Sequence, residues 1–110
     1  SRYSVEARER IIELRDSMLA HEYYVADYYE KLEKWRAVAW RLQGAIERYP
    51  ELAKTEKILF RLGDAFQKAG DLKDAERTYA LYVQAFPAGA RLPEVNQRLE
   101  SIRQRQPSAL

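Results

Sequence analysis

The sequence predicts an all-α fold in which a helical hairpin repeats along the chain. Three observations support this prediction. The 110 residues include only four Gly and four Pro, and Ala, Leu, Glu, Arg and Lys dominate, which favours helices. Apolar residues recur at steps of three, four or seven, the period of a helix with one buried face. One hairpin-length pattern occurs twice at an offset of 37 residues, as from Pro50 to Pro87.

The clearest copy of the pattern lies between Glu56 and Pro87. It reads Leu59-x2-Leu62-Gly63-x2-Phe66, then Ala75-x3-Tyr79, then Pro87. These offsets match the tetratricopeptide signature W-x2-L-G-x2-Y, A-x3-F, P, and the three differences exchange large apolar or aromatic side chains. Small residues at 63 and 75 let two helices approach, and Pro87 ends the second helix. The prediction is a tetratricopeptide-repeat solenoid with two complete hairpins, a long N-terminal helix and a C-terminal capping helix.

Caps and breakers give the helix boundaries. Residues 4–33 contain no Pro or Gly and form one long predicted helix with Ser4 as N-cap. Thirty residues is long for a globular helix, so it either bends near Ala20 or spans two structural units. Further helices are predicted at 35–49, 56–69, 72–86 and 92–104, with 51–54 and 87–90 as connections. Thr55 and Asp71 are expected to cap helices, and Gly70 to close one in the left-handed conformation.

The whole chain is expected to form one domain, and its segments follow from the repeat. They are a remnant of an upstream repeat at 1–18, a first repeat at 19–52, a connection at 53–55, a second repeat at 56–89, a capping helix at 91–105 and a frayed tail at 106–110.

The first helix carries an apolar stripe of Ala7, Ile11, Leu14, Met18, Val25, Tyr29 and Leu32. Glu22 falls on this stripe. Either it reaches solvent at the stripe's edge, or it is a buried carboxylate paired with an arginine such as Arg15 or Arg41. An unpaired buried charge would cost several kcal/mol, about the scale of breaking a buried ion pair.

Composition and motifs argue against several functional classes. The net charge of +2 is balanced and gives no clustered basic face for nucleic acid. Cysteine is absent, His21 is the only histidine, and no phosphate-binding loop or nucleophile motif occurs. We therefore expect no enzyme activity, cofactor or metal. No apolar run approaches the roughly 20 residues that span a bilayer, and no signal peptide is present, so we expect a fragment or processed domain.

Protein binding is the functional class that remains, and the repeat pattern indicates which surface would bind. First helices of stacked hairpins line a concave groove, which should expose Tyr23, Asp27 and Glu30 from the first repeat and Phe60, Asp64 and Gln67 from the second. Co-chaperones of this superfamily hold a carboxylate with a Lys/Asn clamp, whereas the matching positions here are Tyr23 and Asp27. The alternative is that all six are ordinary exposed residues.

Two further candidates lie outside the groove. Trp40 is placed opposite the inner face of its helix, where it can anchor a partner or pack on the first helix. Arg91, Arg98, Arg103 and Arg105 form either a solvated face or a dock for an acidic partner.

One stretch goes beyond the generic repeat. Glu13-Leu14-Arg15-Asp16, Leu19-Ala20-His21-Glu22, Val25-Ala26, Tyr28-Tyr29, Ala39, Arg41 and Tyr49-Pro50 together resemble the BamD family of outer-membrane assembly lipoproteins. Met18, Tyr28 and the turns after Tyr49 and Phe86 depart from the family pattern.

The resemblance implies the C-terminal part of a periplasmic lipoprotein at the inner leaflet of the outer membrane. It implies a non-enzymatic scaffold that helps insert β-barrel proteins. Its partners would be a POTRA domain of the central barrel-assembly subunit and accessory lipoproteins, met through Trp40 and the C-terminal arginines. Membrane attachment would be through a lipid anchor absent from this fragment. Two alternatives stay open: another tetratricopeptide adaptor of cell-envelope or pilus assembly, and a structural repeat that self-associates through residues 7–18.

Overall fold

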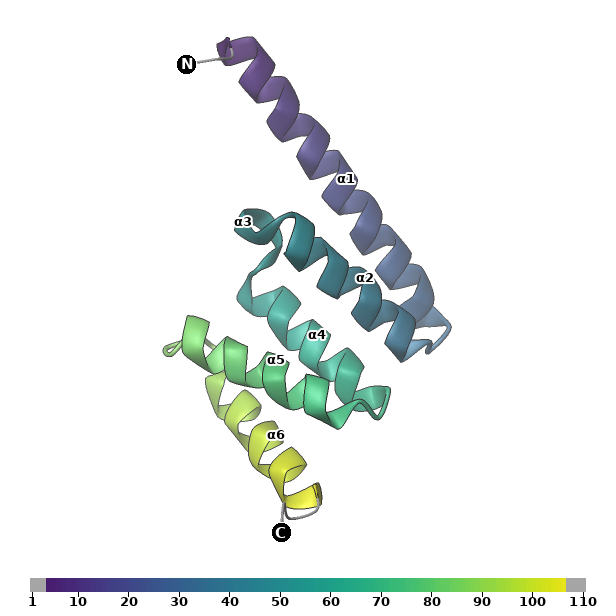
Figure 1. The fold of residues 1–110 in the computed structure, drawn as a ribbon, viewed down its shortest axis with the longest axis vertical. Coiled ribbons are helices and arrows are strands. Elements are labelled where there is room, and N and C mark those ends of the chain that lie inside the picture. The colour runs from purple at the N-terminus through teal and green to yellow at the C-terminus, as the bar shows by residue number, and fades with distance from the viewer. Residues whose placement is uncertain (1–3, 107–110) are drawn as a thin grey trace.

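The computed structural model describes residues 4–106, and these residues form six α-helices and a tetratricopeptide-like, all-α fold. The helices are α1 (Val5–Lys31), α2 (Trp35–Arg48), α3 (Pro50–Ala53), α4 (Glu56–Lys68), α5 (Leu72–Ala85) and α6 (Leu92–Arg105). In Figure 1, α1 with α2 and α4 with α5 form two stacked hairpins, and α6 lies against α5. The N-terminal half of α1 extends beyond the rest of the molecule.

Helix ends form where the sequence provides capping groups. The Ser4 hydroxyl accepts the Ala7 N–H at 3.1 Å, and the Thr55 hydroxyl accepts the Ile58 N–H at 3.3 Å. Gly70 adopts φ 84°, a conformation that favours glycine, directly after the end of α4. These three predictions are confirmed.

The first helix is continuous and does not break near Ala20 (Figure 1). Its buried residues are Leu19 and Ala26, which lie in the half that packs on α2. Leu14 and Met18 of the predicted stripe are 54% and 57% exposed. The N-terminal part of the predicted stripe was therefore wrong as a packing face, whereas Tyr29 further along it packs against the core.

Two local predictions were also wrong. The segment predicted as a connection forms the single turn α3, because Pro50 fits the first helical position, where its missing N–H has no partner to lose. Asp71 occupies the N-cap position of α5 but its side chain makes no cap hydrogen bond. Its two oxygens instead accept from Arg36 Nη2 and Nε at 2.7 and 2.9 Å, and these bonds lower the pKa of the Asp71 carboxyl.

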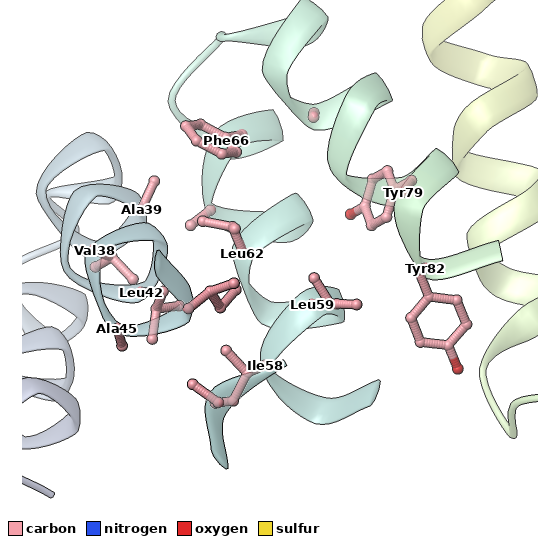
Figure 2. Close-up of a cluster of buried hydrophobic side chains, with 14 of the residues drawn as sticks. Val38, Ala39, Leu42, Ala45, Ile58, Leu59, Leu62, Phe66, Tyr79 and Tyr82 are labelled. Carbon is pink, nitrogen blue, oxygen red and sulfur yellow. The ribbon is translucent and has the colours of Figure 1, made fainter. Parts of the chain in front are cut away.

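The core is a continuous layer between the helices of both hairpins. Figure 2 shows Leu42 of α2 facing Leu62 of α4, with Tyr79 and Tyr82 of α5 on the other side. Leu42, Tyr79 and Tyr82 are fully buried, and Leu62 is nearly so. The Tyr79 ring of α5 lies directly against Gly63 of α4, so the missing side chain at Gly63 lets the two helices of the second hairpin approach there.

Gly63→Ala should destabilise the fold by about 1–3 kcal/mol. The added methyl would lie 2.7 Å from Tyr79 Cδ1, inside the closest contact that packed atoms tolerate. The matched control is Gly44→Ala in α2, whose methyl would meet only the flexible end of Arg48, at 3.0 Å. Urea denaturation should show the control unchanged or stabilised by up to about 1 kcal/mol. Equal effects at both sites would contradict the packing role of Gly63.

Candidate protein-binding surfaces

A hollow of about 390 Å³ opens on the surface formed by α1 and α4. It is lined by Asp27, Glu30, Lys57, Phe60, Arg61, Asp64 and Arg91. Four of the six predicted groove residues therefore lie together. We call this set of lining residues the concave hollow.

The other two predicted groove residues lie on the same helices but outside this lining. Tyr23 is half-buried on α1, and burial raises the pKa of its hydroxyl, while the nearby Arg61 charge lowers it. Gln67 accepts a hydrogen bond from the Tyr79 hydroxyl at 3.3 Å. Gln67 thus contributes to the packing between α4 and α5.

An ion pair between an aspartate and an arginine occurs twice, 37 residues apart. Each pair links the first helix of one hairpin to the helix that follows it in the stack. Arg61 Nη2 donates to Asp27 at 2.7 Å, and Arg98 Nη1 donates to Asp64 at 2.7 Å. Positions 27 and 64, like positions 61 and 98, are 37 residues apart. The pair therefore joins α1 to α4 and, in the same way, α4 to α6. Arg61 was missed from the sequence, although the matched spacing of the two pairs was a usable signal.

Phe60 lies at the centre of the concave hollow, with two guanidinium groups over its ring. Arg91 Cζ lies 4.4 Å and Arg98 Cζ 4.8 Å from the ring centroid, both within cation–π range. Phe60 is half-buried, and Lys57 and Arg91 are exposed at the rim. The hollow thus presents an aromatic surface with cationic groups around it.

Arg98 is held inside the protein by several partners. Its side chain is 29% exposed, and it donates to Asp64, to the Tyr79 hydroxyl at 3.0 Å and to Glu94 at 3.0 Å. Burial opposes its charge, but the hydrogen bonds from Arg98 to Asp64 and Tyr79 outweigh burial and raise its pKa. Burial raises the pKa of the Tyr79 hydroxyl.

The four C-terminal arginines do not form one patch. Arg91 and Arg98 contact the concave hollow, whereas Arg103 Nε donates to Glu76 of α5 at 2.8 Å. Arg105 is exposed at the end of α6. The arginines that were predicted as a single surface divide between two sides of α6.

Trp40 is 73% exposed and borders a second hollow, of about 540 Å³. Its lining comes from α2, α4 and α5: Trp40, Gln43, Gly44, Glu47, Phe66, Asp74, Arg77 and Thr78. The prediction of an exposed indole is confirmed, and the alternative of packing on the first helix was wrong, because no residue of α1 joins this lining. We call this set of residues the Trp40 hollow.

Glu22 is a largely buried carboxylate with two arginine partners. Its side chain is 14% exposed, and it lies 3.5 Å from Arg41 and 3.4 Å from Arg48. Pairing with Arg41 is confirmed. Arg15 instead pairs with Glu51 of α3, at 3.0 Å.

Among residues 4–106 no group of histidine and acidic side chains is arranged to hold a metal ion. No helix in that part of the chain has the length and apolar character needed to cross a membrane.

Comparison with known proteins identifies the family. Residues 1–81 match the sequence model of YfiO, described as outer membrane lipoprotein. The chain belongs to this family. The YfiO match covers the first hairpin, the Asp27–Arg61 pair and the contact of Gly63 with Tyr79. It confirms the resemblance drawn from the first repeat.

Curated relatives carry the name outer membrane protein assembly factor BamD. The Haemophilus influenzae protein is 36% identical over 70 residues, which is 64% of this chain and 27% of the relative. The Xylella fastidiosa (strain 9a5c) protein is 32% identical over 71 residues, 64% of this chain and 24% of the relative. The Pasteurella multocida protein is 29% identical over 85 residues, 77% of this chain and 32% of the relative. The chain spans about a quarter to a third of these YfiO relatives, and no solved structure matches.

Glu22→Gln should destabilise the fold by about 1–2 kcal/mol, less than for a fully buried pair because both arginines are partly exposed. The matched control is Glu51→Gln, whose pair with Arg15 is exposed on both sides and should contribute under about 0.5 kcal/mol. Thermal and urea unfolding at neutral pH measure both. If Glu22→Gln unfolds at the same midpoint as the parent chain, the pairing does not stabilise the α1–α2 hairpin.

Proposed function

We propose that this chain is a non-enzymatic protein-interaction scaffold that assists the assembly and insertion of β-barrel proteins at the periplasmic side of the outer membrane. Membership of the YfiO family of outer membrane lipoproteins supports this, as does the name of the curated relatives. The observation that carries the proposal is the concave hollow, whose aromatic centre is fixed by charged pairs between successive helices.

The geometry of this surface suits protein binding. Aromatic and arginine side chains dominate the energetics of protein interfaces. Phe60 provides a half-buried ring, and Arg91 and Lys57 provide cations that remain accessible at its rim. Asp27 and Glu30 on the opposite wall are already paired with Arg61, so the wall offers polar contacts without an unpaired charge.

The proposed partners are a POTRA domain of the central barrel-assembly subunit and accessory lipoproteins. Phe60, Arg91 and Trp40 are the residues we expect to contact them, on two different sides of the solenoid. Arg98 and Arg103 act indirectly, because their charges are engaged by Asp64 and Glu76.

The exposed side of α1 favours a second candidate role, self-association. Ile11, Leu14 and Met18 are exposed at helical spacing, and contiguous apolar patches of this kind mark interaction surfaces. A second copy of the chain could cover them.

Site-specific photocrosslinking in the cell envelope tests which candidate holds. With p-benzoylphenylalanine in place of Phe60 in the full-length protein, we expect a major adduct with the central barrel-assembly subunit, mapped to a POTRA domain. The control site is Lys73, an exposed position on α5 outside both hollows, which should give no such adduct.

Two outcomes would contradict the proposal. Adducts only with a pilus or other envelope component would indicate a different adaptor. Adducts only between two copies of the chain would show that Phe60 faces a second copy in place of the barrel-assembly subunit.

A further inference from the structure

The Trp40 hollow combines an aromatic ring with a carboxylate, as the concave hollow does. Three features define it: an exposed indole, a carboxylate two turns further along the same helix, and a glycine between them. Trp40, Gly44 and Glu47 follow at steps of four and three, so they lie in one row on α2. Gly44 adds no side chain to this row, and the flexible end of Arg48, which pairs with Glu22, lies beside it. Phe66 and Thr78, both buried, form the floor.

Elsewhere among residues 4–106, three arginines complete this combination. One is Arg91, which lies 4.4 Å from the Phe60 ring centroid and 3.8 Å from Glu94. Arg98 lies 4.8 Å from the Phe60 ring centroid while donating to Asp64 at 2.7 Å. Arg15 lies 5.9 Å from the Tyr49 ring centroid while donating to Glu51 at 3.0 Å. In each case one guanidinium lies over an aromatic ring and also pairs with a carboxylate, two contacts for which its planar shape is suited.

At Trp40 the aromatic ring and the carboxylate are present without a cation from the chain itself. Glu47 accepts a hydrogen bond from the neutral amide of Gln43 at 3.2 Å. Among residues 4–106, no basic group forms an ion pair with Glu47 and none lies over the Trp40 ring. The second acidic residue of the lining, Asp74, is paired with Arg77 at 2.9 Å. Among residues 4–106, Glu47 is therefore the acidic residue of this lining that has no ion pair.

We propose that the Trp40 hollow binds an arginine side chain presented by a partner protein. The guanidinium would stack on the Trp40 indole and hydrogen-bond Glu47, reproducing the arrangement that the chain builds at Phe60 and Tyr49. At Trp35 a lysine makes the corresponding contacts, since Lys68 Nζ lies 4.4 Å from the ring centroid and 3.2 Å from Asp64. We expect arginine at Trp40 because only a planar guanidinium can stack on the ring and donate two N–H groups to the carboxylate. The hollow of about 540 Å³ lies within the range of roughly 300–1,000 Å³ typical of ligand pockets.

The partner's arginine would approach on the side of the solenoid formed by α2 and α5, away from the concave hollow. This inference rests on the proposed scaffold function in one respect: both assume that the partner is a protein. Its test uses a defined peptide and the isolated chain, so it can fail while crosslinking at Phe60 succeeds, and the reverse.

The test is a titration of the ¹⁵N-labelled chain with the peptide acetyl-Ala-Leu-Arg-Leu-Ala-amide, followed by NMR. The indole N–H resonance of Trp40 should shift and reach saturation. The indole of Trp35 is the internal reference and should stay in place, because Lys68 Nζ already lies 4.4 Å from the centroid of its ring. A peptide with citrulline in place of arginine has the same shape without the charge and should bind at least about tenfold more weakly.

Matched variants locate the binding. Glu47→Gln should weaken binding of the arginine peptide by about threefold to tenfold. The control Glu100→Gln should leave it unchanged, since Glu100 accepts an equivalent amide hydrogen bond from Gln104 on α6. In Trp40→Ala, the backbone amide of Gly44 serves as the reporter and should no longer respond to the peptide.

Three results would overturn the proposal. The first is a Trp40 resonance that does not move with the arginine peptide. The second is equal affinity for the arginine and citrulline peptides. The third is equal weakening by Glu47→Gln and Glu100→Gln, which would show attraction to surface charge in general.

Discussion

An aspartate on one first helix and an arginine on the next hold the concave surface of this solenoid together. The pair occurs between α1 and α4 and again between α4 and α6, each time with a 2.7 Å hydrogen bond. The second arginine, Arg98, also lies against Phe60 and donates to Tyr79, which in turn packs on Gly63. The Arg98 guanidinium of α6 therefore contacts Phe60 in the concave hollow, Asp64 on α4 and Tyr79 at the crossing of the second hairpin.

Most of the stability comes from apolar packing, whereas the charged pairs favour one register of each helix against the next. Leu42, Leu59 and Tyr79, in the layer between α2, α4 and α5, are fully buried, as are Val95 and Ile102 of α6. Such packing is non-directional and tolerates small slides of one helix along the next. A short, partly buried arginine–carboxylate contact has a defined geometry and favours one register.

The fold could be predicted because its signature residues are packing residues. Gly63, Ala75 and Tyr79 are constrained by the crossing of two helices, a local event that leaves a spacing in the sequence. The exposure of Trp40 could also be predicted, because it lies opposite the buried face of α2. Groove residues such as Asp27, Phe60 and Asp64 were placed correctly relative to one another, since all of them lie on first helices.

What could not be predicted depends on how hairpins stack. Arg61 reaches Asp27 only because α4 lies beside α1, and Arg36 removes Asp71 from its capping role only because α2 and α5 begin close together. The packing face of α1 was misjudged for a related reason. The stripe continues through Leu14 and Met18, but no other helix among residues 4–106 covers these two side chains, whereas Leu19 and Ala26 are buried.

A double-mutant cycle on Asp64 and Arg98 tests the central claim most directly. Asp64→Asn, Arg98→Gln and the double variant, unfolded in urea, should give a coupling free energy of about 1–2 kcal/mol. The same cycle on the exposed pair of Asp74 and Arg77 should give under about 0.5 kcal/mol. If the two coupling energies are the same, the recurring pair does not set the stacking of the first helices.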